Sequence, residues 1–298
     1  MDVRSKKDEL YYHAMLLPGM ILLFIFSVIP MMGIIMAFQK YVPAKGIRGS
    51  AMVGFYQFER MLAIPDVHMV FFNTIYIAVF KIVLGIIVPV VFALLLSEVR
   101  LTKFKRAVQT ICYLPNFLSW VILAVIFSNL FAYTGIFNQI VALFGGEPIL
   151  FLASNTWFRP ILIATDVWKG FGYGAVIYLA AISNIDPNLY EAADIDGANR
   201  LEKIWYVTLP GIRATIILMS TLALGNVLNA GFEQIFTMYS PIVYPTADII
   251  DTYVYRMGLA KLNFSFGTAV GLLKSVVSFA LIVISYLLAD RYAGYRIF

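Results

Sequence analysis

Residues 184–213, with the sequence NIDPNLYEAADIDGANRLEKIWYVTLPGIR, carry side chains that suit the docking of a partner protein. Glu191 can accept hydrogen bonds from an arginine of another chain, and such charge-assisted bonds are among the stronger ones in proteins. The adjacent Ala192 and Ala193 are small enough for a second backbone to approach closely. The chemistry expected here is therefore recognition of another protein.

The same stretch predicts two short helices that meet at a glycine. Asp186 can cap the exposed amides of a first helix, and Pro187 suits the first helical position. Gly197 tolerates the conformation that ends a helix. Residues 199–202 begin with asparagine and end with glutamate, which is capping-box spacing, so a second helix should start there and stop at Pro210. The two helices should form a rigid, bent element.

A second group of polar side chains lies inside apolar stretches. An ionisable residue in a membrane helix costs about 2.5–3.5 kcal/mol on insertion scales, so it marks a functional interior by default. The asparagines in the fifth apolar stretch can hydrogen-bond sugar hydroxyls or hold neighbouring helices together, and we favour the first role because many polar groups crowd that stretch. The candidates for a substrate path are Lys81, Asp166, Lys169, Asn226, Asn229, Glu233 and Lys274.

Two explanations are open for the charges in this group. Asp166 and Lys169, at positions i and i+3, can share a helix face and partly neutralise each other. Lys81 and Lys274 can pair with carboxylates of a partner subunit. Alternatively, these groups line a translocation cavity, in which three lysines and one aspartate give a charge of +2. Such a cavity would favour anionic over neutral solutes.

The composition places these residues in a membrane protein. Of 298 residues, 61% are hydrophobic and 13% charged, and the mean hydropathy is +0.84. A soluble domain has about 25% charged residues, so an ordinary cytoplasmic enzyme is excluded. The single Cys112 excludes a disulfide framework and a thiolate metal cluster, and His13 and His68 lie too far apart in sequence to favour a zinc site.

Six apolar stretches are long enough to cross a membrane. A hydrocarbon core of about 30 Å requires about 20 helical residues. The stretches are apolar on every face and lack the alternation of barrel strands, so we predict helices. The predicted spans cover residues 15–38, 70–96, 107–132, 158–182, 214–232 and 266–289. The expected fold class is therefore all-α, a polytopic membrane protein with six transmembrane helices.

Lysine and arginine counts predict the orientation. With the N-terminus inside, 12 basic residues lie in inner segments and 7 in outer segments, which favours cytoplasmic termini. The net charge of +5 is then a result of topology, and no nucleic-acid partner is expected. The organisation is an inner tail (1–14), a first anchor helix (15–38), an outer loop (39–69), a five-helix core (70–290) that includes the inner loop 183–213, and an inner tail (291–298).

The inner loop resembles a known family. Residues 191–193 read Glu-Ala-Ala, and Gly197 follows after three residues; after nine more comes Val207-x-Leu209-Pro210. This pattern resembles the EAA loop in permease subunits of binding-protein-dependent ABC importers. Softer resemblances to the maltose-transporter-type sugar permeases, and within them to a polysaccharide and oligosaccharide subgroup, lie in the stretches PNFLSW (115–120), GFEQIF (231–236) and DIIDTYVYRMGL (248–259). The valine replaces the usual isoleucine, and Ala214 stands where a further proline is common.

The resemblance implies a type I ABC importer permease fold and a non-catalytic role in the bacterial plasma membrane. It implies partners as well: a second homologous permease subunit as a heterodimer, a cytoplasmic ATPase dimer, an extracellular sugar-binding lipoprotein and an oligosaccharide substrate. The first short helix would sit in a cleft of the ATPase and transmit its closure to the spans. The implied docking residues are Glu191, Ala192, Ala193, Asp196, Gly197, Leu209 and Pro210.

Glycine patterns elsewhere do not indicate nucleotide binding. No G-x-x-x-x-G-K-[ST] phosphate loop occurs, so ATP and magnesium belong to a partner chain, and this chain should bind no cofactor. Gly170, Gly172 and Gly174 lie within a predicted span and indicate close helix packing or a locally opened helix. The Gly267-x-x-x-Gly271 spacing likewise indicates close helix approach.

Two other functions remain as alternatives. An ABC permease for a non-sugar solute, such as a polyamine, phosphate or peptide, would carry the same loop. A stand-alone secondary transporter fits the intramembrane charges, although the docking loop would have no role in it. A membrane-embedded transferase would require an aspartate-rich metal motif facing the membrane, and none is evident.

Overall fold

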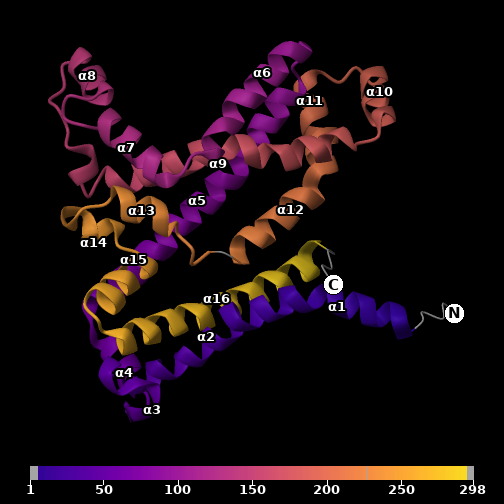
Figure 1. The fold of residues 1–298 in the computed structure, drawn as a ribbon. Coiled ribbons are helices and arrows are strands. Elements are labelled where there is room, and N and C mark those ends of the chain that lie inside the picture. The colour runs from indigo at the N-terminus through magenta and orange to yellow at the C-terminus, as the bar shows by residue number, and fades with distance from the viewer. Residues whose placement is uncertain (1–5, 226, 294–298) are drawn as a thin grey trace. The chain divides into compact units, whose positions relative to one another are not determined.

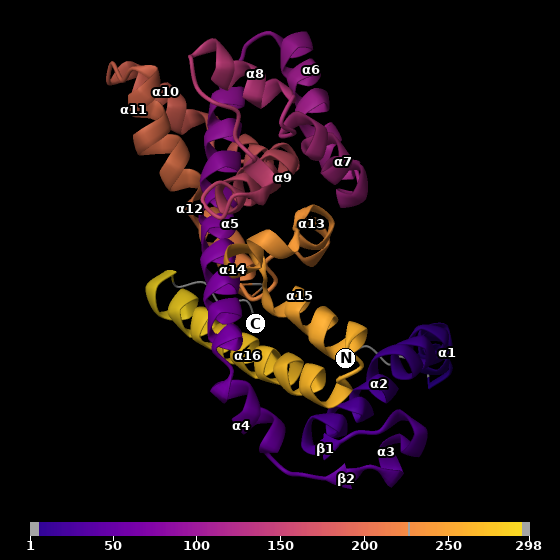
Figure 2. The same ribbon diagram turned by 90° about the vertical axis from the view of Figure 1, so that its left-hand side faces the viewer.

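The computed structural model describes residues 6–225 and 227–293, with the backbone alone for 6–10 and 288–293. The described chain is mostly helical, with one two-stranded antiparallel sheet that pairs Gln39 with Met52. It divides into two compact units, Met1–Pro65 with Val254–Leu273, and Asp66–Tyr253 with Lys274–Phe298. Figures 1 and 2 show the elements of both units.

The first unit begins with a long apolar helical segment. The most apolar window within Tyr11–Phe38 has a mean hydropathy of 2.6, and only 6% of that window is buried, so its apolar side chains are exposed on every side of the helix. A π-helical turn and a 3-10 turn flank Pro30, whereas Pro18 lies inside α1. The unit comprises α1 (Lys6–Leu23), η1 (Phe24–Val28), α2 (Ile29–Met31), η2 (Met32–Phe38), β1 (Gln39–Lys40), η3 (Pro43–Lys45), α3 (Gly46–Gly49), β2 (Ala51–Met52), α4 (Tyr56–Ala63), η8 (Tyr255–Ala260) and the first residues of α16 (Phe264–Ala293).

The second unit is built around one long helix, α5. Two clusters of buried apolar residues pack along it, one with Ile77, Leu123, Leu162 and Ile235, the other with Val90 and its neighbours. The elements are α5 (Pro65–Ser97), α6 (Thr102–Tyr113), η4 (Leu114–Phe117), α7 (Trp120–Leu130), α8 (Ile136–Leu143), η5 (Phe151–Ala153), α9 (Phe158–Ser183), α10 (Pro187–Ile195), α11 (Arg200–Lys203), η6 (Ile204–Thr208), α12 (Leu209–Gly225), α13 (Phe232–Met238), η7 (Pro241–Val243), α14 (Tyr244–Ala247), α15 (Ile250–Val254) and the rest of α16.

Four or five candidate spans are present in the described residues. Four helices are long and apolar enough to cross a membrane: Tyr11–Phe38, Pro65–Ser97, Arg200–Gly225 and Phe264–Leu287. The predicted third span is a bent pair, α6 and α7, with an angle of 104° at the break. α9 covers the predicted fourth span over 26 residues, but its glycines and charges keep it out of this set. The chain is thus a mostly helical membrane protein.

Two sequence predictions about helix ends are wrong. Pro210 does not stop a helix, because a continuous helix runs from Arg200 to Gly225. The widened π-helical turn η6 directly before this proline accommodates its ring and its missing amide hydrogen. The predicted fifth span to residue 232 ends at Gly225, and α13 starts only at Phe232, after Gly231 with φ of 98°. Glycine permits that left-handed conformation.

Close helix packing at Gly172 confirms the prediction made from the glycine pattern. An added methyl group at this position of α9 would collide with the backbone carbonyl of Cys112 on α6. Gly267 is similarly close to Gly258, within the first unit, whereas Gly170 has open space beside it. Only some of the glycines in these motifs are therefore required by packing.

Gly172→Ala should destabilise the protein, and Gly170→Ala should not. Overpacking costs about 1–3 kcal/mol, so the first variant should melt several degrees lower. Thermal unfolding of the detergent-solubilised protein measures the difference. Equal melting temperatures for the two variants would contradict the close contact between α6 and α9.

Candidate functional site

The docking element begins with the expected cap. Asp186 accepts a hydrogen bond from the Asn188 amide at 3.0 Å, and Pro187 occupies the first position of α10. The helix runs to Ile195 and ends at Gly197, whose φ of 80° is in the left-handed region. Start and end of the predicted first helix are confirmed, because local capping chemistry determines both.

The second short helix is fixed to the first by side-chain bonds. The capping box is complete: Asn199 accepts from the Glu202 amide at 3.0 Å, and Glu202 accepts from the Asn199 amide at 2.7 Å. Lys203 forms an ion pair of 2.7 Å with Asp194 of α10. The hydroxyls of Tyr190 (α10) and Thr208 (η6) lie 3.0 Å apart. The element is therefore bent and rigid, as predicted.

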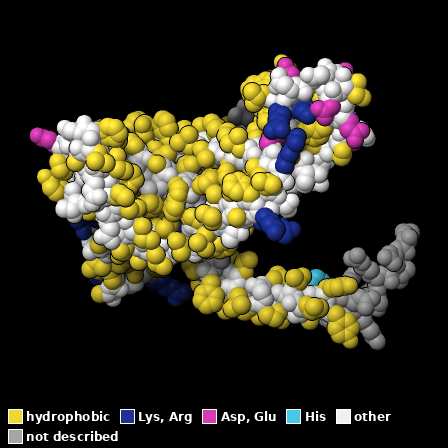
Figure 3. Space-filling view, turned by 90° about the horizontal axis from the view of Figure 1, so that it is seen from above, with side chains coloured by type: hydrophobic (Ala, Val, Ile, Leu, Met, Phe, Trp, Pro, Cys, Tyr) yellow, Lys and Arg dark blue, Asp and Glu magenta, His cyan; other side chains and the backbone are white. Residues whose placement is uncertain are grey.

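One face of this element is exposed in the described chain. Glu191, Ala192, Asp196, Gly197 and Pro210 are exposed and Ala193 is half-buried, whereas Leu209 packs against a buried cluster. Ile195, at the tip, is 87% exposed. Figure 3 shows Lys, Arg, Asp and Glu side chains gathered where α10 and α11 lie, with hydrophobic side chains over much of the rest of that face. An exposed surface that mixes charged and apolar side chains suits a protein partner.

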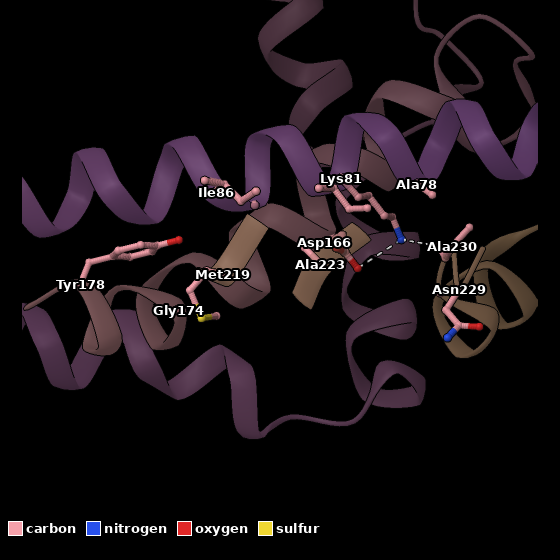
Figure 4. Close-up of a pocket in the computed structure, with 13 residues that line it drawn as sticks. Ala78, Lys81, Ile86, Asp166, Gly174, Tyr178, Met219, Ala223, Asn229 and Ala230 are labelled. Carbon is pink, nitrogen blue, oxygen red and sulfur yellow. Dashed lines mark hydrogen bonds and ion pairs between the residues drawn. The ribbon is translucent and has the colours of Figure 1, made fainter. Parts of the chain in front are cut away.

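A buried lysine connects three helices and the loop that carries Ala230. Lys81 on α5 donates to Asp166 on α9 at 3.2 Å and to the backbone oxygen of Ala230 at 2.8 Å. It also donates to the Gln234 side chain on α13. Gln234 is fully buried and donates in turn to Leu162 and Thr165 of α9, both at 2.8 Å. Figure 4 shows the Lys81 ammonium group between Asp166 and Ala230.

The predicted pairing of Asp166 with Lys169 is wrong. Asp166 pairs with Lys81, and the Lys169 ammonium instead donates to the backbone oxygen of Asn116 at 2.9 Å and lies 5.5 Å from the ring centroid of Trp120. The physical reason is the sharp bend between α6 and α7. The break exposes backbone carbonyls there, and in a membrane each of these requires a donor.

A second pair occurs at Lys274 on α16. Its ammonium group donates to Asp251 at 2.6 Å and to Asn229 at 2.8 Å. Lys81 and Lys274 thus both pair within the chain rather than with a partner subunit. Sequence reasoning missed Asp251 and Gln234 as partners, because both lie outside the predicted spans and no spacing rule connects them to a distant lysine. With Asp251 counted, three lysines face two carboxylates, and the charge is +1 instead of +2.

A cavity of about 310 Å³ lies beside the Lys81 network, within the second unit. Three predicted path residues line it, Lys81, Asp166 and Asn229, together with apolar and aromatic groups such as Tyr178 and Met219. Lys169, Glu233 and Lys274 are not among the lining residues, and Glu233 is exposed on α13. Asn226 lies outside the described residues. The cavity offers hydrogen-bonding groups in an otherwise apolar wall, which suits a polar solute in transit.

Lys81→Met should destabilise the protein strongly, and the double variant Lys81→Met, Asp166→Asn should recover much of the loss. Removing one partner of a fully buried ion pair costs about 3–5 kcal/mol. The cost here should lie below that range, because the Asp166 side chain is 34% exposed and water screens part of its charge. Thermal unfolding of the solubilised single and double variants measures the coupling. Additive losses in the double variant would show that the two side chains do not interact.

The chain matches one family model and is similar to several known proteins. The family model described as "Binding-protein-dependent transport system inner membrane component" matches residues 85–294. The polygalacturonan/rhamnogalacturonan transport system permease protein YteP of Bacillus subtilis (strain 168) is 41% identical over 286 residues, 96% of this chain and 89% of YteP.

Two solved structures are similar over nearly the whole chain. A subunit of a bacterial ABC transporter that imports the acidic polysaccharide alginate has a TM-score of 0.88 and 36% identity, covering 96% of this chain and 97% of its own. The transporter in complex with an alginate pentasaccharide-bound periplasmic protein gives the same TM-score and identity, with 96% of each chain covered. The chain therefore belongs to the family of inner membrane components of binding-protein-dependent transport systems, as a non-catalytic, multi-pass permease.

Proposed function

We propose that this chain is one of two homologous permease subunits in an ATP-driven importer of acidic oligosaccharides. In this proposal it spans the bacterial plasma membrane six times, with both termini in the cytoplasm. α9 and the bent pair α6–α7 each count as one span. A cytoplasmic ATPase dimer holds ATP and magnesium, and an extracellular binding lipoprotein delivers the sugar.

The exposed α10–α11 element is the observation that carries this proposal. Its exposed side chains are Glu191, Ala192 and Asp196, and Gly197 ends its first helix. In a permease of this family, such an element is expected to fit the ATPase, so that closure of the ATPase dimer moves α10. Leu209 packs inward, so its expected contribution is to hold the element on the core.

Two observations support an acidic substrate: the substrates named for the similar proteins, and the charges of the residues predicted for the path. YteP is named as a polygalacturonan/rhamnogalacturonan transport permease, and the two similar structures belong to an alginate transporter. Among the five charged residues predicted for the path, Lys169 is the cation with no carboxylate partner in the described chain. An uncompensated cation in a membrane interior favours an anionic solute.

The other two candidate functions predict different behaviour. A permease for a non-sugar solute would still require the ATPase, but it would not respond to oligosaccharides. A stand-alone secondary transporter would take up its solute without any ATPase. The following two experiments separate these cases.

Gly197→Pro should abolish co-purification of the ATPase while leaving the second permease bound. Proline requires φ near −65°, whereas Gly197 has φ of 80°, so the end of α10 must change shape. Gly145→Pro is a matched control, since Gly145 has φ of 77° just beyond the end of α8, and both glycines have open space beside them. Affinity purification of the tagged chain from native membranes makes the measurement. An ATPase retained by Gly197→Pro, or absent from wild type, would contradict the docking role.

Uptake should favour a pentagalacturonate over its carboxyl-reduced analogue of equal length by about tenfold or more, equivalent to about 1.4 kcal/mol. Lys169→Met should narrow this preference, and Lys169→Arg should preserve it because the charge stays. Transport into proteoliposomes that contain the complete importer, with each sugar at a concentration that saturates the binding protein, gives the ratio. Equal rates for the acidic and reduced sugars in wild type would contradict an acid-selective path.

A further inference from the structure

Charge that could recognise an acidic partner also lies outside the candidate spans. Lys81 and Lys274 are paired with aspartates, so two of the three intramembrane lysines are neutralised. The segment between the first two candidate spans, residues 39–64, holds a separate set of cations. It also lies outside the residues 85–294 that the family model matches.

Three of these cations are exposed and unpaired. Lys40, Lys45 and Arg48 are all exposed, and none forms an ion pair within the described residues. No aspartate or glutamate occurs anywhere in residues 39–58; the nearest acidic residue in sequence, Glu59, follows on α4. We call Lys40, Lys45 and Arg48 the basic patch.

The backbone that carries the basic patch is folded rather than extended. Lys40 pairs with Ala51 across β1 and β2, and the buried Gln39 donates to the Ile47 oxygen at 2.9 Å. Ser50 donates to the Gly46 oxygen at 2.7 Å and accepts from the Val42 amide at 3.0 Å. Figure 2 shows β1, α3 and β2 together. The three charges therefore sit on a fixed frame, which lowers the entropy lost on binding.

The same frame is attached to the start of α16 within the first unit. The Tyr41 amide donates to the Ser265 hydroxyl at 2.9 Å, and Arg60 lies 5.5 Å from the ring centroid of Phe266. Beside the patch in sequence, Met52, Phe55 and Tyr56 are 62%, 68% and 55% exposed. Methionine, aromatic residues and arginine are enriched in protein–protein interfaces relative to the rest of the protein surface.

We infer that the basic patch, with Met52, Phe55 and Tyr56 at its edge, is a docking surface for an acidic face of the importer's binding protein. Transport in this family depends on such a protein, which must approach the outer side. In the proposed topology, residues 39–64 lie on the outer side of the membrane. Cations here run against the usual inward excess of lysine and arginine, so topology does not explain them. The inference rests on the proposed function, because it requires that orientation.

The triple variant Lys40→Glu, Lys45→Glu, Arg48→Glu tests the inference in the complete importer, reconstituted in nanodiscs. ATPase activity is measured while the binding protein, saturated with pentagalacturonate, is titrated. Reversing three charges should raise the concentration for half-maximal stimulation about tenfold or more at low salt, with an unchanged maximal rate, because the patch acts on association. The wild-type value should rise with salt, and that of the variant should not.

The control Lys40→Arg, Lys45→Arg, Arg48→Lys keeps every charge and should behave as wild type. A triple reversal that titrates as wild type would overturn the inference. An effect that disappears in nanodiscs of neutral lipid would also overturn it, because the patch would then act on lipid headgroups. So would a changed preference for acidic over reduced sugar at saturating binding protein, because the patch would then act on the carbohydrate. A wild-type importer that no loaded binding protein stimulates would instead refute the proposed function.

Discussion

The second unit depends on one constraint: a lysine held in the membrane interior must be fully satisfied. Lys81 meets it with a carboxylate, a backbone carbonyl and an amide, contributed by three elements other than its own helix. In low dielectric each of these bonds is strong, and an unmet one is costly, so the lysine fixes α5, α9 and α13 relative to one another. The carbonyl comes from Ala230, beyond the end of α12, and the cation thereby compensates a backbone group that a continuous helix would have bonded internally. The Lys81 ammonium group thus satisfies the Ala230 carbonyl left free by the helix break, and that carbonyl helps to satisfy the buried ammonium group.

This arrangement places the cavity at the end of a contiguous route from the docking element. Tyr190 of α10 is hydrogen-bonded to Thr208, and Ile185, just before the Asp186 cap, lies against Gly211. α10 and the residues that lead into it therefore contact the helix that begins at Arg200 at two separate points. That helix continues to Gly225 without a break, and its residues Met219 and Ala223 line the cavity. A displacement of α10 would therefore reach the Lys81 network through packed contacts and one rigid helix, with no mobile linker between them.

The sequence was sufficient where local chemistry decides the structure. The Asp186 cap, the end of α10 at Gly197 and the capping box at Asn199 and Glu202 each depend on residues within a few positions, and all three were predictable. The close approach at Gly172 was predictable in kind, although not its partner Cys112. The sequence predictions fail where residues distant in sequence determine the structure. The helical spacing offered Asp166 only Lys169 as a partner, whereas the three-dimensional packing pairs it with Lys81 on another helix. Pro210 was misjudged because a π-helical turn, which no propensity rule anticipates, lets the helix continue.

The distribution of charge bears on how an importer can be selective without holding its substrate tightly. Strong, unpaired lysines along the path would bind a polyanion and slow its release, because conduction requires sites that are weak enough to leave. Pairing Lys81 and Lys274 with Asp166 and Asp251 reduces the field they present to the cavity. Lys169 has no carboxylate partner among the described residues, yet a carbonyl and the face of Trp120 already attract it, which moderates its pull on a carboxylate of the substrate. Lys40, Lys45 and Arg48, which form no ion pair in the part of the chain that the structure describes, lie instead on a folded segment between spans. Their attraction there would speed the encounter with the binding protein without trapping the solute in transit.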